Sequence, residues 1–283
     1  MTINQAYMDR FIENAIAEDV GDGDHTSLSC IPSSKTGKAQ LLIKQDGIIA
    51  GIQVASSIFQ KLDGDTKFKL LIQDGSVVHE GEIAFLVEAK VLVILKAERL
   101  VLNVMQRMSG IATQTNHYVK KLEGLKTKVL DTRKTTPGMR LFDKAAVKMG
   151  GGENHRFGLY DMILLKDNHI DFAGGIENAI QKANDYLNIK KKNIPIEIEA
   201  RSLDELKKIL AFGKIHRIML DNFTPELTKQ AVSLINGRYE TESSGNITLD
   251  NIRNYAECGV DYISVGALTH QIQSLDLSLK AIT

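Results

Sequence analysis

The sequence predicts an α/β protein in two parts: a small unit of mostly antiparallel strands over residues 1–126, and a parallel (β/α) barrel over residues 127–283. Two observations support this prediction. After Lys126, strand and helix patterns alternate with little interruption, which favours a parallel sheet. Polar residues also stand at the carboxyl end of strand after strand. Because many strands contribute to one rim, the pattern indicates a barrel rather than a doubly wound sheet.

The composition is that of an ordinary globular protein and points to small ligands. The 283 residues are 43% hydrophobic and 25% charged, with 35 basic side chains against 35 acidic ones. With no charge excess, attraction to nucleic acid or to an anionic membrane has little to act on. No apolar run is long enough to span a bilayer, and the N-terminus does not match a signal peptide. Cys30 and Cys258 fit neither a CxxC pair nor a metal-binding spacing, so we expect a reducing, cytoplasmic setting without nucleic-acid or membrane partners.

In the first part, helical spacing near the N-terminus predicts a helix that ends at the glycines and aspartates of residues 21–24. A hairpin-like pattern at residues 74–81 is similar to lipoyl carriers, but no modifiable lysine stands at an exposed turn, so a structural sheet is the better interpretation. A long helix over 98–118, broken or restarted at Ser109-Gly110, links the two parts. Strands are expected over 39–44, 47–50, 68–72, 77–78 and 83–93, with a helix over 54–62.

In the second part, short apolar strands and amphipathic helices follow each other in the order typical of right-handed β-α-β crossovers. Strands are expected near residues 127–132, 161–166, 195–200, 216–220, 238–242 and 261–265. Helices are expected near residues 140–149, 175–187, 203–211, 225–235 and 248–257.

Four basic residues, Arg133, Lys134, Arg156 and Lys166, lie at the ends of two predicted strands or just before one. Converging in one barrel mouth, they would repel each other unless anionic groups neutralised them. Arginine forks suit carboxylates and phosphates, and lysines supply point charges to phosphate oxygens. Any one of them alone could be a solvated surface charge. Together, flanked by Thr, Asn and His side chains, they predict a site for a polyanionic ligand.

Residues 196–200, with the sequence IEIEA, place Glu197 and Glu199 on one face of a strand and the isoleucines on the other. In a barrel the apolar face meets the helices, so the carboxylates point inward, where they need a cation or a donor. With Asp221 ending the next strand, Glu199 could face a hydrated Mg²⁺ or ribose hydroxyls. The alternative is a salt bridge to the basic cluster. Both interpretations stay open for Glu197, and function is favoured for Glu199, nearer the rim.

Two further loops, at residues 243–246 and 265–267, each follow a late strand and precede a helix. Their small residues would let backbone N–H groups reach a phosphate at a helix N-terminus, where barrels often bind one. An ordinary tight turn would explain either loop by itself. Two such loops at adjacent late strands favour a second anion site.

The chain carries the motifs Asp131–Gly138 (DTRKTTPG), Gly150–Arg156 (GGGENHR), Leu164–His169 (LLKDNH), Leu220–Asn222 (LDN) and Val265–His270 (VGALTH), with Ala17–Asp24, Glu98-Arg99 and Ser109–Ala112. These motifs closely resemble those of the quinolinate phosphoribosyltransferases, also called nicotinate-nucleotide pyrophosphorylases (decarboxylating), over nearly the whole chain. The resemblance implies a type II phosphoribosyltransferase with an N-terminal α/β sandwich and an incomplete (β/α) barrel, and it leaves open that the C-terminal tail packs back on the N-terminal domain.

The resemblance also implies an activity and an assembly. The family makes nicotinate mononucleotide, CO₂ and pyrophosphate from quinolinate and phosphoribosyl pyrophosphate in NAD biosynthesis, and it uses Mg²⁺. Its homodimers complete their active sites across the interface, which leaves higher oligomers open.

Carried over position by position, the resemblance implies a role for each matching residue. Quinolinate would be bound by Arg133, His155, Arg156, Lys166 and, from the partner subunit, Arg99. Lys134, Glu199 and Asp221 would hold the pyrophosphate, ribose hydroxyls and metal, with Glu199 and Asp221 as metal ligands. The 5′-phosphate would lie at Ser244, Gly245, Asn246, Gly266 and His270. The catalytic set is then Lys134, Lys166, Glu199 and Asp221.

One position departs from the family pattern, which commonly reads Ser-Gly-Gly where this chain has Ser244-Gly245-Asn246. Asn tolerates a left-handed backbone better than most residues, so we expect the loop to survive. Three other classes compete with the main interpretation. A Schiff-base aldolase needs a desolvated lysine, which Lys166 amid carboxylate binders does not suggest. A molybdenum-transport-associated paralogue would share the fold, and a non-enzymatic phosphoribosyl-ligand sensor could keep the scaffold.

Overall fold

The computed structural model describes residues 5–282, which form two compact units. The first unit comprises the chain up to Asn116, the segment Thr135–Gly151 and the C-terminal segment from Gln271. The second comprises His117–Lys134 and Gly152–His270. The helix expected over 140–149 therefore groups with the N-terminal elements. Within the described residues, no helix has the length and apolar character needed to cross a membrane.

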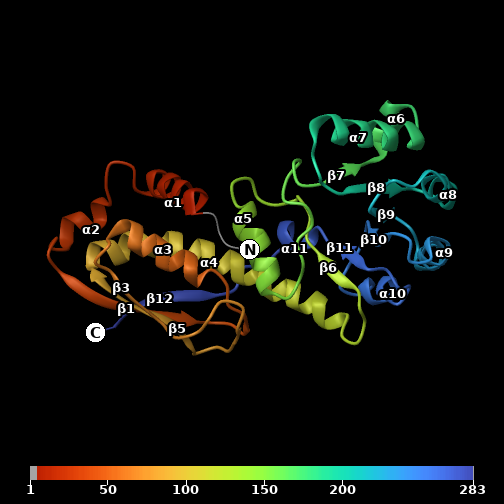
Figure 1. Ribbon diagram of the computed structural model, residues 1–283. Helices are drawn as coiled ribbons and strands as arrows, with labels where there is room; N and C mark the ends of the chain where they lie inside the picture. Colours follow the sequence, from red (N-terminus) through yellow and green to blue (C-terminus); the bar gives the residue numbers. More distant parts are fainter. Residues whose placement is uncertain (1–4, 283) are drawn as a thin grey trace. The chain divides into compact units, whose positions relative to one another are not determined.

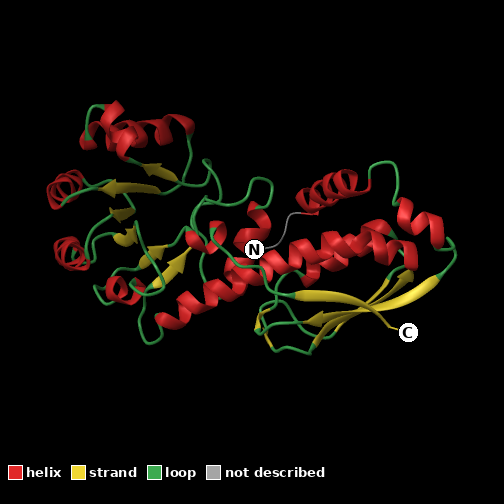
Figure 2. Ribbon diagram, turned by 180° about the vertical axis from the view of Figure 1, so that it is seen from behind, coloured by secondary structure: helices red, strands yellow, loops and turns green. Residues whose placement is uncertain are grey.

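The first unit is built on a four-stranded antiparallel sheet in the order β12-β1-β5-β3, with helices beside it (Figures 1 and 2). Along β1, Ala39, Leu41 and Ile43 are buried in alternation with more exposed neighbours, so one face of the sheet forms the core. The elements are α1 (Gln5–Val20), α2 (His25–Cys30), β1 (Thr36–Ile43), β2 (Gly47–Ile48), α3 (Ile52–Leu62), β3 (Lys67–Leu70), β4 (Val77–Val78), β5 (Ile83–Lys90), α4 (Val91–Lys121), α5 (Arg140–Met149) and β12 (Leu277–Ile282).

The C-terminal strand β12 joins this sheet as an edge strand, antiparallel to β1, with Leu41 opposite Leu279. The sequence pattern predicted neither this strand nor the short helix α2. Local pattern could not find β12, because its strand character depends on hydrogen bonds to a segment more than two hundred residues away.

Two expectations about α4 were wrong. It begins at Val91, so the residues 91–93 assigned to a strand are helical, and it runs through Ser109-Gly110 without a break. Packing explains the Ser-Gly pair. The Ser109 hydroxyl accepts the Ala50 N–H at 2.9 Å and donates to the Ala50 carbonyl at 3.2 Å. A Cβ on Gly110 would collide with the Gln273 carbonyl oxygen, so glycine here permits a close backbone approach.

The second unit is a six-stranded parallel sheet in the order β6-β11-β10-β9-β8-β7, with its helices along the outside of the strands (Figure 1). From β7 to β11 each strand lies beside the next one in the chain, as in a barrel. In a doubly wound sheet the order of the strands would reverse partway through the chain. The elements are β6 (Lys128–Leu130), β7 (Ile163–Leu165), α6 (Asp167–Ala173), α7 (Ile176–Lys190), β8 (Ile196–Ala200), α8 (Leu203–Phe212), β9 (Arg217–Asp221), α9 (Pro225–Ile235), β10 (Glu240–Ser244), α10 (Ile252–Ala256), β11 (Tyr262–Ser264) and α11 (Ala267–His270).

The barrel is incomplete, because β6 and β7 stand at the two ends of the strand order and no pairing among the described residues joins them. All six predicted barrel strands are present within a few residues of their expected bounds. The helices differ more. Short α6 and α11 were not expected, and α10 covers only the C-terminal half of the helix predicted over 248–257. The predicted combination of an N-terminal sheet-and-helix domain and an incomplete (β/α) barrel is confirmed.

The close packing at Gly110 generates a stability prediction. In an open helix Gly→Ala would stabilise by about 1 kcal/mol, but here the methyl group meets backbone that cannot rotate away. We expect Gly110→Ala to lower the free energy of unfolding by about 1–3 kcal/mol, measured by urea denaturation. Asn103→Ala, at an exposed position of the same helix, is the matched control and should be neutral or slightly stabilising. A stabilised Gly110→Ala would show that the segment at Gln273 moves freely.

Candidate active site at the barrel mouth

The carboxyl ends of the barrel strands bring most of the predicted site residues to one edge of the second unit. Each strand contributes there, either with its last residues or with the loop that follows. Arg133 and Lys134 follow β6, Lys166 follows β7, Glu199 lies near the end of β8, Asp221 ends β9, Ser244 ends β10 before Gly245 and Asn246, and Gly266 follows β11.

Lys166 and Glu199 form an ion pair across neighbouring strands β7 and β8. The second oxygen of Glu199 accepts the N–H of Asp167 at 3.1 Å, at the start of α6. Glu199 is only 4% exposed, so both contacts offset the desolvation of its carboxylate. The salt-bridge alternative is therefore present in this structure, with Lys166 as the cation. Because the Lys166 side chain is 45% exposed, its ammonium group can still reach a ligand.

Asp221 lies next to this pair, at the end of β9. Burial raises the pKa of Asp221, and the negative charge of Glu199 raises it further, while Lys166 acts in the opposite direction. The Asn222 amide donates to Asp221 at 2.8 Å. Glu199 and Asp221 lie close enough to repel each other, and their carboxylates are the hard oxygen ligands that Mg²⁺ prefers.

The loop after β10 is tightly built around Asn222. The Asn222 N–H donates to the Ser244 carbonyl at 2.8 Å, and its side-chain oxygen accepts the Asn246 amide at 3.2 Å. Gly245 and Asn246 both have left-handed backbone, with φ of 96° and 53°. A Cβ at Gly245 would overlap the Asn222 side chain, so this position requires glycine. Asn246 therefore takes the left-handed conformation that was expected of it.

At the end of the sheet formed by β6 and β11, three site residues lie together: Lys134, Gly266 and His270. A Cβ on Gly266 would lie 3.0 Å from Nε2 of His270 and 3.1 Å from Cδ of Lys134, so both side chains flank this glycine. The Thr269 hydroxyl donates to the Lys134 carbonyl at 2.8 Å and holds the backbone. Among the described residues the Lys134 ammonium group has no ion-pair partner.

Arg133 and Arg156 place two guanidinium groups near each other. Burial lowers the pKa of Arg156, and the positive charge of Arg133 lowers it further. Arg156 donates to the Met162 carbonyl at 3.2 Å. The Arg133 Nε is buried and has no hydrogen-bond partner within the described chain. Neighbouring cations with an unused buried donor favour a ligand with more than one negative charge.

His155 lies beneath this rim rather than at it, in a buried layer with Glu197 and Glu242. Its Nε2 is 3.0 Å from a Glu197 oxygen and 3.4 Å from a Glu242 oxygen. Arg217 donates to Glu242 at 3.2 Å and stacks on the ring of Tyr262. A His-Glu-Glu set can also bind a metal, but a guanidinium group already neutralises one of these carboxylates.

Sequence reasoning left the role of Glu197 open and did not assign Glu242 or Arg217 to this layer. Glu240 and Glu242 alternate along β10 as residues 197 and 199 do along β8. This alternation was the sequence pattern that could have predicted an inward-facing glutamate on β10. The pairing partners could not be found locally, because they lie on different strands.

The protonation of His155 is subject to two opposing influences. Burial alone would lower the pKa of His155, but Glu197 and Glu242 outweigh it and raise the pKa, which favours a charged ring. However, Nδ1 accepts the Arg156 N–H at 2.7 Å, and a ring nitrogen accepts only when it carries no proton. Two N–H groups would repel strongly at that distance. The hydrogen bond therefore decides for the neutral ring with its proton on Nε2.

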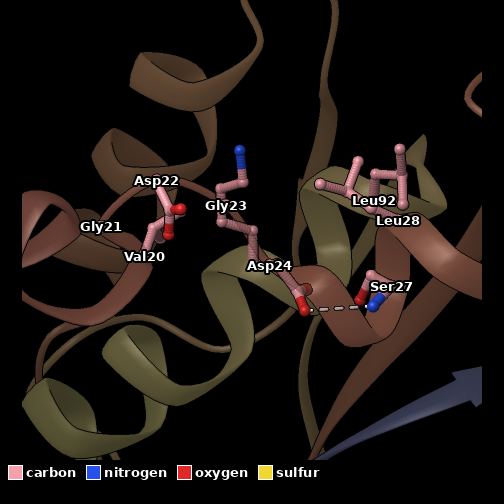
Figure 3. Close-up of a pocket in the computed structure, with 9 residues that line it drawn as sticks. Val20, Gly21, Asp22, Gly23, Asp24, Ser27, Leu28 and Leu92 are labelled. Carbon is pink, nitrogen blue, oxygen red and sulfur yellow. Dashed lines mark hydrogen bonds between the residues drawn. The ribbon is translucent and has the colours of Figure 1, made fainter.

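Two other features of the sequence lie in the first unit. Figure 3 shows a cavity lined by Asp22, Asp24 and neighbouring residues, in which the Asp24 carboxylate accepts the Ser27 N–H at 3.1 Å and caps α2. Arg99 is exposed on α4, with no hydrogen bond or ion pair to other described residues. Arg99 thus belongs to the first unit, whereas the groups at the barrel mouth belong to the second.

The fold and the rim define a class of protein: an incomplete (β/α) barrel whose mouth carries a cluster of basic side chains beside a carboxylate pair. Comparison with known proteins then gives the family. Residues 24–109 match the model of the quinolinate phosphoribosyl transferase N-terminal domain, and residues 111–280 match that of the C-terminal domain. The chain belongs to the quinolinate phosphoribosyltransferase family.

Individual relatives are similar to this chain over almost its full length. A chloroplastic nicotinate-nucleotide pyrophosphorylase (carboxylating) of Oryza sativa is 46% identical, over 96% of this chain and 77% of the relative. The probable enzyme of the same name from Bacillus subtilis is 39% identical, over 98% and 94%. The structure of the nicotinate-nucleotide pyrophosphorylase from Francisella tularensis superposes with a TM-score of 0.93 at 40% identity, over 99% and 98% of the two chains.

The buried layer predicts a pH dependence of stability. Burial, with the charge of Glu242, raises the pKa of Glu197 from 4.5 to about 7. Between these values the folded state holds a proton that the unfolded state has lost, so this group's contribution to stability falls as pH rises from 4.5 to 7. We expect wild type to lose stability relative to Glu197→Gln across this window, measured by urea unfolding. Glu240→Gln, an exposed partner of the same Arg217, is the control. A constant difference would contradict the prediction.

Proposed function

We propose that the protein transfers the phosphoribosyl group of phosphoribosyl pyrophosphate to the ring nitrogen of quinolinate, with decarboxylation. The products are nicotinate mononucleotide, CO₂ and pyrophosphate, a step of NAD biosynthesis. The observation that best supports this activity is the mouth itself, where the cations Arg133, Arg156 and Lys166 adjoin the carboxylates Glu199 and Asp221. Family membership and the names of the relatives support the same reaction.

Quinolinate, in this proposal, binds at the cationic side of the mouth. Its two adjacent carboxylates would take the charges of Arg133, Arg156 and Lys166, and the buried Nε of Arg133 would gain a partner. Bidentate pairing of arginine with carboxylate fixes the plane of the ligand, and with it the direction of the ring nitrogen.

Phosphoribosyl pyrophosphate would occupy the remaining strands. Lys134 suits the pyrophosphate, because its ammonium group is exposed and unpaired within the described chain. The loop of Ser244, Gly245 and Asn246, with Gly266 and His270, suits the 5′-phosphate. Glu199 and Asp221 would hold the ribose hydroxyls and Mg²⁺, whose chemistry is to neutralise negative charge on the pyrophosphate.

The chain's own groups then account for the charge changes of the reaction. When the bond between ribose C1 and pyrophosphate breaks, positive charge develops on the sugar beside Glu199 and Asp221, and Lys134 faces the departing anion. The ring nitrogen of quinolinate attacks C1 with its lone pair. Loss of the adjacent carboxylate as CO₂ leaves an electron pair on the ring carbon, which takes a proton from Lys166 or from water.

The competing classes gain no support. Both domains match enzymes of this family over nearly the whole chain, so neither a molybdenum-transport-associated paralogue nor a phosphoribosyl-ligand sensor is favoured. For the setting we propose the reducing cytoplasm, in keeping with the free thiols of Cys30 and Cys258. The names of several plant relatives place those proteins in the chloroplast or the mitochondrion.

Direct assay tests the proposed reaction. The protein is incubated with quinolinate, phosphoribosyl pyrophosphate and Mg²⁺, and nicotinate mononucleotide, pyrophosphate and CO₂ are quantified. Equal amounts of the three products are expected. Glu199→Gln serves as the control with the same fold and a neutral side chain at the carboxylate position. Binding of both substrates without any product would instead identify a sensor.

The cationic mouth predicts discrimination between substrates. Quinolinate offers two carboxylates to Arg133, Arg156 and Lys166, whereas nicotinate offers one and would leave buried charge unpaired. We expect kcat/KM for quinolinate to exceed that for nicotinate by about 10⁴-fold. Steady-state kinetics with both acids measures the ratio. Comparable turnover of nicotinate would show that the second carboxylate is not recognised.

We propose further that the protein is a homodimer in which Arg99 reaches the partner's quinolinate site. Its support is the family resemblance, together with an exposed guanidinium group that has no partner among the described residues. Mixing inactive Arg99→Ala with inactive Arg133→Ala would form heterodimers in which one site has both lesions and the other none. About a quarter of wild-type activity should return after random subunit exchange.

Mass spectrometry provides the control for that experiment, because it shows whether the two variants have exchanged subunits. Exchange without recovery of activity would mean that Arg99 acts within its own chain or not at all.

A further inference from the structure

The ring of His155 is buried, with a neighbour close to each of its nitrogens. Its side chain is only 6% exposed, Nδ1 accepts the Arg156 N–H at 2.7 Å, and Nε2 lies 3.0 Å from Glu197. A ligand carboxylate approaching the ring would therefore find no exposed edge to bind. It would also meet the negative charge of the Glu197–Glu242 layer behind the ring.

The backbone of His155 is held as firmly as its ring. Its N–H donates to the fully buried Asp131 carboxylate at 2.8 Å. Two residues before His155, Glu153 makes two backbone hydrogen bonds along β6. Its N–H donates to the Val129 carbonyl at 2.8 Å, and its carbonyl accepts the Asp131 N–H at 3.1 Å. The segment that ends in Arg156 is thus anchored along β6 up to residue 155.

Both carboxylates that face the ring lie close enough to Arg217 to feel its positive charge. Glu197 stands opposite Arg217 in the register of β8 and β9, and Arg217 reaches across to Glu242 on β10. The Arg217 guanidinium lies 4.1 Å from the centre of the Tyr262 ring, on β11. His155 therefore connects a rigid layer spanning four strands to the backbone of the next residue, Arg156.

We propose that His155 is a positioning residue that sets the direction of the Arg156 guanidinium, and that it does not itself bind the quinolinate carboxylates. This inference rests on the proposed function and changes the role that the family resemblance implied for His155. Arg156 has one other anchor in the described chain, its hydrogen bond to the Met162 carbonyl. Loss of the N–H contact would leave the peptide free to rotate, and a small rotation moves the end of a long side chain out of bidentate geometry.

A double-mutant cycle on quinolinate affinity separates positioning from direct binding. His155→Gln can still reach the glutamates but lacks an acceptor at the Nδ1 position. Isothermal calorimetry without phosphoribosyl pyrophosphate should show quinolinate binding weakened about tenfold in this variant. In an Arg156→Ala background the same change should have almost no further effect, because His155 acts through Arg156. Additive losses would mean that His155 contacts the ligand independently, and would overturn the proposal.

A conservative variant provides the matched control. In His155→Asn the side-chain oxygen takes the place of Nδ1, so it can accept the Arg156 N–H while losing contact with the glutamates. We expect it to bind quinolinate clearly more tightly than His155→Gln does. Equal losses in both variants would contradict the positioning role. Circular dichroism and thermal unfolding of each variant separate these effects from loss of the fold.

Nitrogen-15 spectra of the wild-type imidazole test the arrangement without any ligand. A proton on Nε2 and none on Nδ1 at neutral pH is the expected result, and a proton on Nδ1 would overturn the proposal. If wild type neither binds quinolinate nor turns it over, the proposed function fails. The spectra would still decide whether His155 holds the Arg156 backbone.

Discussion

Charge pairing in the interior of the barrel is the constraint on which the rest of the second unit depends. Glu197 and Glu242 are completely buried, and an unpaired carboxylate there would cost several kcal/mol. Arg217 supplies the opposing charge and Nε2 of His155 lies 3.0 Å from Glu197, so these residues bring β8, β9 and β10 and the segment after β6 into one layer. Removing any one member leaves the others buried without compensation, and this makes the layer rigid.

The mouth above that layer has the opposite character. Lys166 pairs with Glu199 while remaining half exposed, and the Lys134 ammonium is unpaired within the described residues. Such charges can exchange partners with an incoming anion at little cost, because water already solvates part of each group. A polar base beneath an exchangeable rim keeps the charged groups in place without a ligand, and it is the physical reason to propose that the chemistry occurs at this end of the strands.

Local pattern predicted the barrel strands well, because each strand is a short apolar run that ends in polar residues. It failed where a distant partner decides the structure. Strand β12 exists through its pairing with β1, and α4 continues through Ser109-Gly110 because Ala50 and Gln273 pack against that pair. Alternation along β8 predicted that both of its glutamates would be buried, and both are. This alternation could not predict that Glu199 would pair with Lys166 at the rim while Glu197 would face His155 in the buried layer.

The sequence alone determined the class of fold, the family and the set of charged residues, because periodicity and motif order are properties of neighbouring residues. The tertiary structure decided how those charges are shared. Glu199 faces Lys166, whereas Glu197, two residues earlier, faces His155, and this difference depends on which side chains other strands bring opposite. The protonation of His155 follows from the same cause. A single N–H from Arg156 overrides two nearby carboxylates, since a ring nitrogen cannot accept a hydrogen bond and carry a proton at once.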